Sequence, residues 1–130
     1  MTLLADASYG GRAAAHEWVE DYIIMLRKGG AKIVNNCGIS DVLMFANKKD
    51  KDKNGQNLHD SQKPVGLFQT LISQSSKKGE TILDPFMGSG TTAIACIREK
   101  RNFIGFEKSE EYWRKSMERI RNELSQQTLF

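Results

Sequence analysis

The sequence has 130 residues, of which 39% are hydrophobic and 27% charged, a composition typical of one globular domain rather than a disordered chain. No apolar run reaches the roughly 18 residues that a membrane span needs, and the N-terminus lacks the profile of a secretory signal, so we expect a cytoplasmic protein with no membrane partner. The formal net charge of +3 permits a polyanionic partner without demonstrating one.

The cysteines and histidines indicate neither a metal site nor a disulfide. Cys37 and Cys96 lie in separate apolar stretches outside any C-x-x-C spacing, and His16 and His59 each stand alone. Isolated thiols in apolar runs are usually small core residues. We therefore expect two core cysteines and no metal.

Four elements are predicted in the first half of the chain. Thr2–Asp6 is a short apolar run typical of a buried strand, and Glu17–Lys28 has helical periodicity that ends at two glycines. Ala31–Cys37 and Asp41–Ala46 are predicted strands. Because only three residues separate those two strands, we expect an antiparallel hairpin. The lysine-rich segment Asn47–Asn57 has no apolar periodicity and is expected to be a solvated loop.

The second half alternates helices and strands more clearly. Helices are predicted over Lys63–Gln74 and Thr91–Glu99, strands over Thr81–Asp84 and Asn102–Glu107, and a last helix is capped by Ser109. The residues expected on the apolar helix faces are Val65, Phe68, Leu71, Ile72, Ile94, Ala95, Ile97, Tyr112, Trp113, Met117, Ile120 and Leu124. Helices that alternate with short apolar strands predict an α/β sheet covered on both faces, in a single domain over residues 1–130.

A glycine loop from Asp84 to Thr92 lies between a predicted strand and a predicted helix. Gly88 and Gly90 allow a sharp turn and a close approach to a ligand. With Ala93 they match the dinucleotide fingerprint, and Glu107 follows at about the distance expected for an acid that binds ribose. The stretch therefore predicts a site for an adenosine-bearing cofactor.

The charges around this loop favour one cofactor class over others. Asp84 ends the preceding strand, where its carboxylate would repel a pyrophosphate at the start of the helix. No lysine follows Gly90, so the loop is not that of a nucleotide triphosphatase. S-adenosylmethionine carries cations and ribose hydroxyls but no phosphate, and it suits acids at both strand ends. A nicotinamide dinucleotide fits the glycines but not Asp84.

Three ordered motifs resemble the DNA amino-methyltransferases of the permuted β class over residues 59–121. They are the His59–Pro64 segment with its lysine-proline pair, the Asp84–Thr92 loop and the Phe103–Glu107 strand. The resemblance implies S-adenosylmethionine as cofactor and DNA as partner. It implies that Glu107 holds the ribose hydroxyls and that Lys63 with Pro64 closes over the methionine end. The loop residues implied to border the methionine and sugar are Asp84, Phe86, Gly88, Ser89, Gly90 and Thr91.

The family's reacting loop corresponds to the segment Asp6-Ala7-Ser8-Tyr9. The resemblance implies that Asp6 accepts hydrogen bonds from the target exocyclic amine and that Tyr9 stacks on a base flipped out of the duplex. Ala7 and Ser8 replace the two prolines of the family pattern, which leaves the backbone of this loop less constrained. No element is long enough to read a DNA sequence, so a second chain could supply target recognition.

The resemblance also implies an open, doubly wound, mostly parallel sheet of about five strands with an antiparallel edge hairpin, as in S-adenosylmethionine-dependent methyltransferases. The strands that begin at Asn102, Thr81, Thr2, Ala31 and Asp41 would lie in that order. Three functions remain open at this point. The chain is a methyltransferase acting on adenine or cytosine, a non-catalytic or truncated remnant that binds the cofactor and needs a partner chain, or half of a nicotinamide-dependent dehydrogenase.

Overall fold

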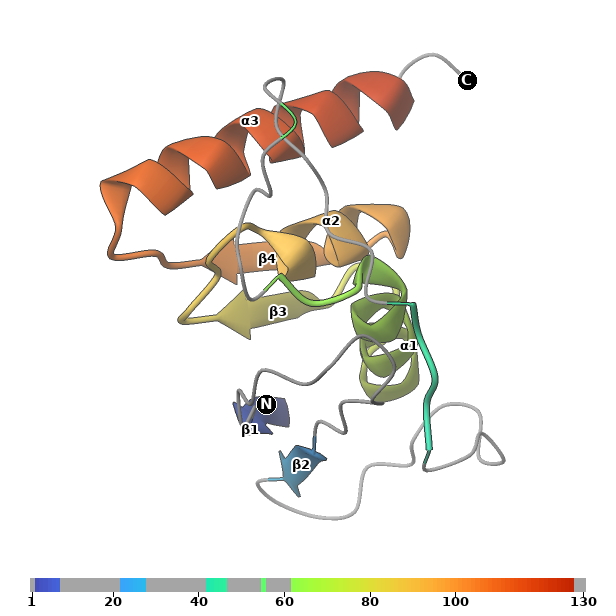
Figure 1. Cartoon of the computed structure of the whole chain (residues 1–130). Helices are drawn as coiled ribbons and strands as arrows, with labels where there is room; N and C mark the ends of the chain where they lie inside the picture. Colours follow the sequence, from blue (N-terminus) through green and yellow to red (C-terminus); the bar gives the residue numbers. More distant parts are fainter. Residues whose placement is uncertain (1, 8–21, 28–41, 47–54, 56–61, 128–130) are drawn as a thin grey trace. The chain divides into compact units, whose positions relative to one another are not determined.

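The computed structural model describes residues 2–7, 22–27, 42–46, 55 and 62–127 (Figure 1). The chain divides into two compact units, Met1–Ile33 and Val34–Phe130. The first contains the strands β1 and β2, and the second contains the strands β3 and β4 together with the helices α1, α2 and α3.

The first unit contains an antiparallel pair of strands. β1 spans Thr2–Ala7 and β2 spans Tyr22–Arg27. Their register runs from Thr2 opposite Arg27 to Ala7 opposite Tyr22. The predicted strand at Thr2–Asp6 is therefore confirmed, and it is one residue longer than expected, so that Asp6 lies within the strand and pairs with Ile23.

The helix predicted over Glu17–Lys28 is wrong over Tyr22–Arg27, where β2 is found. The run from Tyr22 to Leu26 is apolar throughout, so it has no polar face to distinguish an amphipathic helix from a buried strand. The β-branched Ile23 and Ile24 favour the strand. The start of the predicted helix, residues 17–21, lies outside the described residues.

Five elements make up the described part of the second unit. They are α1 (Val65–Ser75), β3 (Thr81–Asp84), α2 (Thr91–Arg98), β4 (Asn102–Gly105) and α3 (Glu110–Gln127). All five were predicted, and their ends differ by at most two residues except at the last helix, for which only the start was expected. Pro64 lies just before α1, as its N-cap, rather than in the first turn. None of the described helices is long and apolar enough to cross a membrane.

The strand predicted over Asp41–Ala46 is wrong over residues 42–46, which form neither strand nor helix. The Phe45 ring instead lies against α1, 3.1 Å from the position that a Cβ at Gly66 would take. The predicted strand Ala31–Cys37 and all of Asn47–Asn57 except Gly55 lie outside the described residues. The predicted hairpin partner, Ala31–Cys37, therefore cannot be compared, and among the described residues the antiparallel pair is β1 with β2.

β3 and β4 pair in parallel, with Thr81 opposite Asn102 and Asp84 opposite Gly105. α2 lies between α1 and α3 (Figure 1) and contacts both. The buried core residues beside this sheet are Leu71, Ile72, Met87, Ala93, Ile94, Ala95, Cys96 and Ile120, and Ile82 and Phe103 of the two strands pack against them. The predicted α/β class is confirmed, with β3 and β4 as its parallel pair.

The buried face of α3 differs from the expected one. Ile120 is buried as predicted, but Trp113 and Leu124 are 45% and 49% exposed. Ser116 is fully buried instead, although a hydropathy pattern would not place a polar serine in the core. The reason is close packing, because a Cβ at Gly90 would lie 3.1 Å from the Cβ of Ser116. The helix thus presents a small residue where the glycine loop approaches it.

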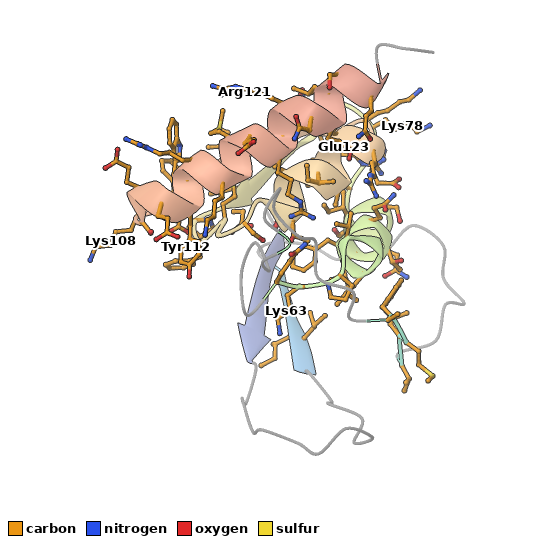
Figure 2. The ribbon with its side chains drawn as sticks, turned by 45° about the horizontal axis from the view of Figure 1, so that its top comes forward. Lys63, Lys78, Lys108, Tyr112, Arg121 and Glu123 are labelled. Atoms are coloured by element: carbon orange, nitrogen blue, oxygen red, sulfur yellow. The ribbon has the colours of Figure 1, made fainter. Side chains whose placement is uncertain are left out.

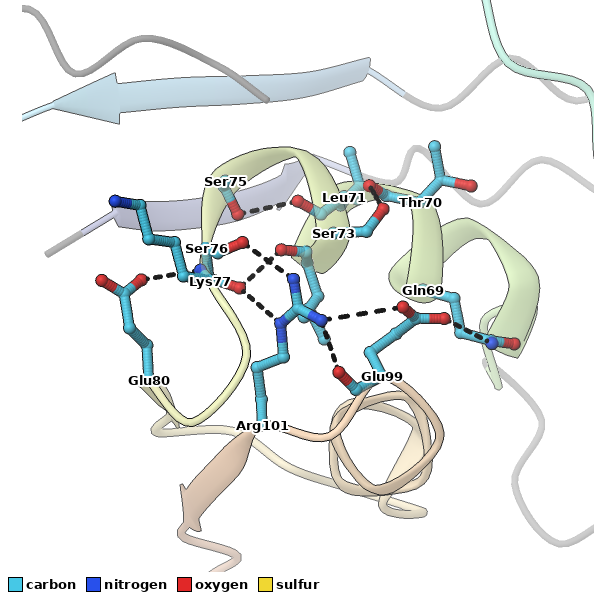
Figure 3. A network of polar contacts seen from close by, with 11 residues as sticks. Gln69, Thr70, Leu71, Ser73, Ser75, Ser76, Lys77, Glu80, Glu99 and Arg101 are labelled. Atoms are coloured by element: carbon cyan, nitrogen blue, oxygen red, sulfur yellow. Dashed lines mark hydrogen bonds and ion pairs between the residues drawn. The ribbon is translucent and has the colours of Figure 1, made fainter. Parts of the chain in front are cut away.

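Arg101, the residue before β4, has a largely buried side chain that connects the C-terminal ends of two helices. Arg101 donates to the Ser76 carbonyl at 2.8 Å and to the Ser76 hydroxyl at 3.1 Å (Figure 3). It also donates to the Glu99 carbonyl, and the Glu99 carboxylate in turn accepts from Gln69 at 2.9 Å. A cation is favoured at helix C-termini, so Arg101 stabilises the packing of α1 against α2.

Cys96 is a core residue, as predicted. Its side chain is fully buried between α1 and the sheet. Burial raises the pKa of the Cys96 thiol from 9.0 to about 11, with a smaller opposing effect from Arg101. A thiol that stays protonated at neutral pH is a poor nucleophile. Cys37 lies outside the described residues.

Candidate cofactor site

Asp84 connects the end of β3 to the first turn of α2. One carboxylate oxygen, Oδ1, accepts from the backbone N–H of Phe86 at 3.0 Å. The other, Oδ2, accepts from the hydroxyl of Thr92 at 2.5 Å. α2 has no acidic residue of its own in its first turn, so Asp84 supplies the negative charge that a helix N-terminus favours.

Two glycines with positive φ shape the loop. Gly88 has φ +53° and Gly90 has φ +80°, both in the left-handed region that costs other residues roughly 1–2 kcal/mol. Gly90 is the N-cap of α2 and has no side chain to cap it. The loop is anchored to β4, because Met87 donates its N–H to the Phe106 carbonyl at 2.8 Å and Phe106 donates to the Asp84 carbonyl at 2.9 Å.

Glu107, two residues after the end of β4, holds the loop in place. Its Oε2 accepts from the N–H of Gly88 at 2.9 Å, and its Oε1 accepts from the N–H of Ser109 at 2.7 Å. Each carboxylate oxygen has a second lone pair, so both can still accept from a ligand hydroxyl. Two backbone donors fix the carboxylate in one orientation next to the glycine loop.

The lysine-proline segment lies beside the start of α2. The hydroxyl of Thr91 donates to the Lys63 carbonyl at 3.4 Å, and Pro64 then forms the N-cap of α1. Figure 2 labels Lys63 on this segment, ahead of α1. The residues of the three motifs are therefore joined by hydrogen bonds: Lys63 to Thr91, Asp84 to Thr92 and Glu107 to Gly88.

The remaining predicted residues fall into two groups. Ser89 is buried, whereas the Phe86 side chain is 88% exposed, which excludes Phe86 as a core residue and leaves its ring accessible to a ligand. Asp6 lies in β1 of the other unit, and Tyr9 lies outside the described residues. The roles of Asp6 and Tyr9 stay predictions.

Sequence reasoning missed two residues of this site. Thr92 was treated as part of the loop without a role, although a hydroxyl in a first helical turn is well placed to reach an acid at the preceding strand end. Arg119 of α3 donates to the Ser89 carbonyl at 3.0 Å and to the Thr91 hydroxyl at 3.3 Å. No local pattern points to Arg119, because its partners precede it by about thirty residues. Among the described residues, no cluster of His, Cys, Asp and Glu side chains could hold a metal ion.

Comparison with known proteins identifies the family. The family model described as DNA methylase, N6_N4_Mtase, matches residues 15–118. The chain belongs to this DNA methylase family. The sequence is 54% identical over 54 residues to the type II methyltransferase M.BglI of Bacillus subtilis, and 49% identical over 57 residues to the type II methyltransferase M2.MboI of Moraxella bovis. These segments cover 42% and 44% of this chain but only 16% and 21% of the two relatives.

Two solved structures share the fold. A complex of M1.HpyAVI with SAM has a TM-score of 0.62 and 30% identity, and the match covers 80% of this chain and 52% of that one. TTHA0409 of Thermus thermophilus, a putative DNA modification methylase, has a TM-score of 0.56 and 25% identity, covering 87% and 49%. The chain thus spans about half the length of these structures, and it has the methyltransferase-like α/β fold that the sequence predicted.

Proposed function

We propose that this chain binds S-adenosylmethionine at the glycine loop and uses it to methylate an exocyclic amine of adenine or cytosine in DNA. The observation that carries the proposal is that hydrogen bonds join the three motifs. The glycine loop bonds to Lys63 through Thr91 and to Glu107 through Gly88, and within the loop Thr92 bonds to Asp84. Membership of the DNA methylase family supports it, as does the fold shared with M1.HpyAVI, which was solved in complex with SAM.

Each cofactor group has a partner of suitable chemistry in this proposal. Glu107 accepts from the ribose hydroxyls, since its carboxylate is already oriented by Gly88 and Ser109. Lys63 and Pro64 close over the methionine end. The residues that border the methionine and the sugar are Asp84, Phe86, Gly88, Ser89, Gly90 and Thr91. The exposed ring of Phe86 offers an apolar surface for the adenosine part.

The position of Asp84 argues against a dinucleotide. A pyrophosphate would bind at the N-terminus of α2, but the Asp84 carboxylate already binds Thr92 in the first turn of that helix. Two anions in one place repel each other, whereas the sulfonium and ammonium groups of S-adenosylmethionine are attracted to a carboxylate. The charge therefore favours S-adenosylmethionine over a nicotinamide cofactor.

Methyl transfer depends mainly on positioning the target amine next to the methyl group, and less on acid catalysis. The amine nitrogen attacks the methyl carbon, the bond between that carbon and the sulfonium sulfur breaks, and the methylated nitrogen then loses a proton to solvent. We propose that Asp6 accepts a hydrogen bond from the amine and that Tyr9 stacks on the flipped base, as in the permuted β class. Ala7 and Ser8 stand where the family pattern has two prolines.

Labelled methyl transfer tests the activity. The purified chain is incubated with S-adenosylmethionine carrying a labelled methyl group and with duplex or single-stranded DNA, and the nucleosides are then separated. We expect label in N6-methyladenine or N4-methylcytosine, lost in Asp6→Ala. Label that persists undiminished in Asp6→Ala contradicts the role of Asp6.

A chain that binds the cofactor but transfers no methyl group supports the remnant alternative. Two changes then separate a defective loop from missing DNA recognition. Replacing Ala7 and Ser8 together with proline restores transfer if the loop is at fault. Adding the target-recognition part of a relative as a second chain restores transfer if DNA recognition is missing.

A further inference from the structure

The side of α3 that faces the glycine loop carries one arginine. Arg119 Nη1 lies 3.0 Å from the Ser89 carbonyl oxygen and 3.3 Å from the Thr91 hydroxyl oxygen. Ser89 and Thr91 are only 6% and 7% exposed, so water has little access to either residue. A hydrogen bond from a charged donor to a poorly solvated acceptor is stronger than one at the surface.

The Thr91 hydroxyl links this arginine to the lysine-proline segment. An arginine can only donate and a carbonyl can only accept, so the Thr91 hydroxyl must accept from Arg119 and donate its proton to the Lys63 carbonyl, 3.4 Å away. Three segments that are distant in sequence, namely α3, the glycine loop and the lysine-proline segment, are thereby connected through one hydroxyl.

Packing holds Arg119 at this position. Ser116, one turn earlier on α3, is fully buried, and its Cβ is 3.1 Å from the position that a Cβ at Gly90 would take. Ile120 is buried beside it, 3.7 Å from the same position. α3 therefore packs directly against the loop, and this packing holds the backbone of Arg119 at a fixed distance from Ser89 and Thr91.

The peptide between Ser89 and Gly90 is the part of the loop that most needs a fixed orientation. Gly90 has φ +80° and no Cβ, so its backbone could rotate to other conformations at little steric cost. A charged hydrogen bond to the Ser89 carbonyl opposes that rotation. The same hydrogen bond fixes the N-terminal end of α2, because Gly90 is its N-cap.

We propose that Arg119 is a positioning residue for the cofactor loop. It holds the Ser89–Gly90 peptide in one orientation and sets the direction of the Thr91 hydroxyl, so that the loop and the Lys63–Pro64 segment are preorganised before the cofactor binds. Arg119 acts through these neighbours. The proposal rests on the proposed function, because it assumes that the loop binds S-adenosylmethionine.

Two measurements on the full chain test this role. The amide nitrogen of Gly90 belongs to the peptide whose carbonyl Arg119 binds, so its NMR chemical shift reports that hydrogen bond without any cofactor. Calorimetric titration with S-adenosylmethionine then gives the affinity. The variants are Arg119→Met and Arg119→Lys, and Arg121→Met is the matched control, since Arg121 is an exposed arginine of the same helix (Figure 2).

We expect Arg119→Met to shift the Gly90 resonance and to weaken binding by about tenfold or more, because the charged hydrogen bonds to Ser89 and Thr91 are both lost. Arg119→Lys should recover part of the affinity, because both observed contacts use a single nitrogen, which an ammonium can replace. Arg121→Met should match the wild type in both measurements. If Arg119→Met fails to fold, Arg119→Lys carries the test by itself: its Gly90 resonance should shift and its affinity should be lower than that of the wild type, and a wild-type resonance with weakened affinity would contradict the positioning role.

Distinct results contradict the two proposals. An unchanged Gly90 resonance in Arg119→Met, or a shifted resonance with wild-type affinity, overturns the role of Arg119. A wild-type chain with no affinity for S-adenosylmethionine contradicts the proposed function instead. The Gly90 resonance still shows in that case whether Arg119 orients the loop, with a shift in Arg119→Met as the supporting result.

Discussion

Replacing Glu107 with glutamine should destabilise the second unit by more than a surface change of the same kind. The Glu107 carboxylate accepts from two backbone donors, Gly88 N–H at 2.9 Å and Ser109 N–H at 2.7 Å. A glutamine side chain has one oxygen, so its amide group would face the second N–H as another donor. Losing one hydrogen bond to a charged acceptor costs about 1.5–3 kcal/mol, and since Glu107 is only partly buried we expect about 2 kcal/mol.

The assay is urea unfolding followed by the helical circular dichroism signal, which reports the unit that contains α1, α2 and α3. Glu110→Gln is the matched control. It makes the same chemical change three residues later, in an exposed side chain that pairs with Arg114 at 2.5 Å, where an exposed ion pair contributes about 0.3–0.5 kcal/mol. Equal unfolding free energies for Glu107→Gln and Glu110→Gln would refute the bridging role of Glu107.

Three further predictions concern other residues. Thr92→Val keeps the side-chain shape but removes the hydroxyl that donates to Asp84 at 2.5 Å, so the free energy of unfolding should fall by about 1–3 kcal/mol. Urea unfolding measures this change, and a loss of less than about 0.5 kcal/mol would contradict the prediction. Phe86→Ala should leave stability within about 0.5 kcal/mol, because the side chain is 88% exposed, while calorimetry shows weaker binding of S-adenosylmethionine; unchanged affinity removes Phe86 from the site. The pKa of Cys96 is about 11 in the folded chain and near 9.0 when unfolded, so ionisation favours the unfolded state between those values. The free energy of unfolding should therefore fall as pH rises from 9.0 to about 11, and it should fall by more in the wild type than in Cys96→Ala. If the urea midpoints of the two proteins change equally over this pH range, the result would argue against a buried thiol.

The second half of the fold could be predicted because its elements have clear local boundaries. Ser109 caps α3, where its hydroxyl accepts from the Tyr112 N–H at 3.4 Å, and the two glycines with positive φ separate β3 from α2. Such signals act within a few residues, and a sequence displays them directly. The strand β3 accordingly has the predicted bounds, Thr81–Asp84.

Two described segments of the first half differ from the prediction, Tyr22–Arg27 and residues 42–46, because no local signal decides their conformation. The hydrophobic pattern of Tyr22–Leu26 does not distinguish a buried helix from a buried strand, and its pairing with β1 decides the outcome. A contact between distant residues has no local signature either. This is why the sequence motifs could point to Asp84 and Glu107 as candidate site residues, whereas nothing in the sequence pointed to Arg119 or to the burial of Ser116.

Calorimetric titration of the purified chain with S-adenosylmethionine, beside an identical titration with NADH, tests the central claim most directly. We predict saturable heat with one cofactor per chain for S-adenosylmethionine, abolished in Asp84→Ala once folding of that variant is verified, and no heat of binding for NADH. Binding of NADH without binding of S-adenosylmethionine would contradict the assignment of the glycine loop to a methyl donor.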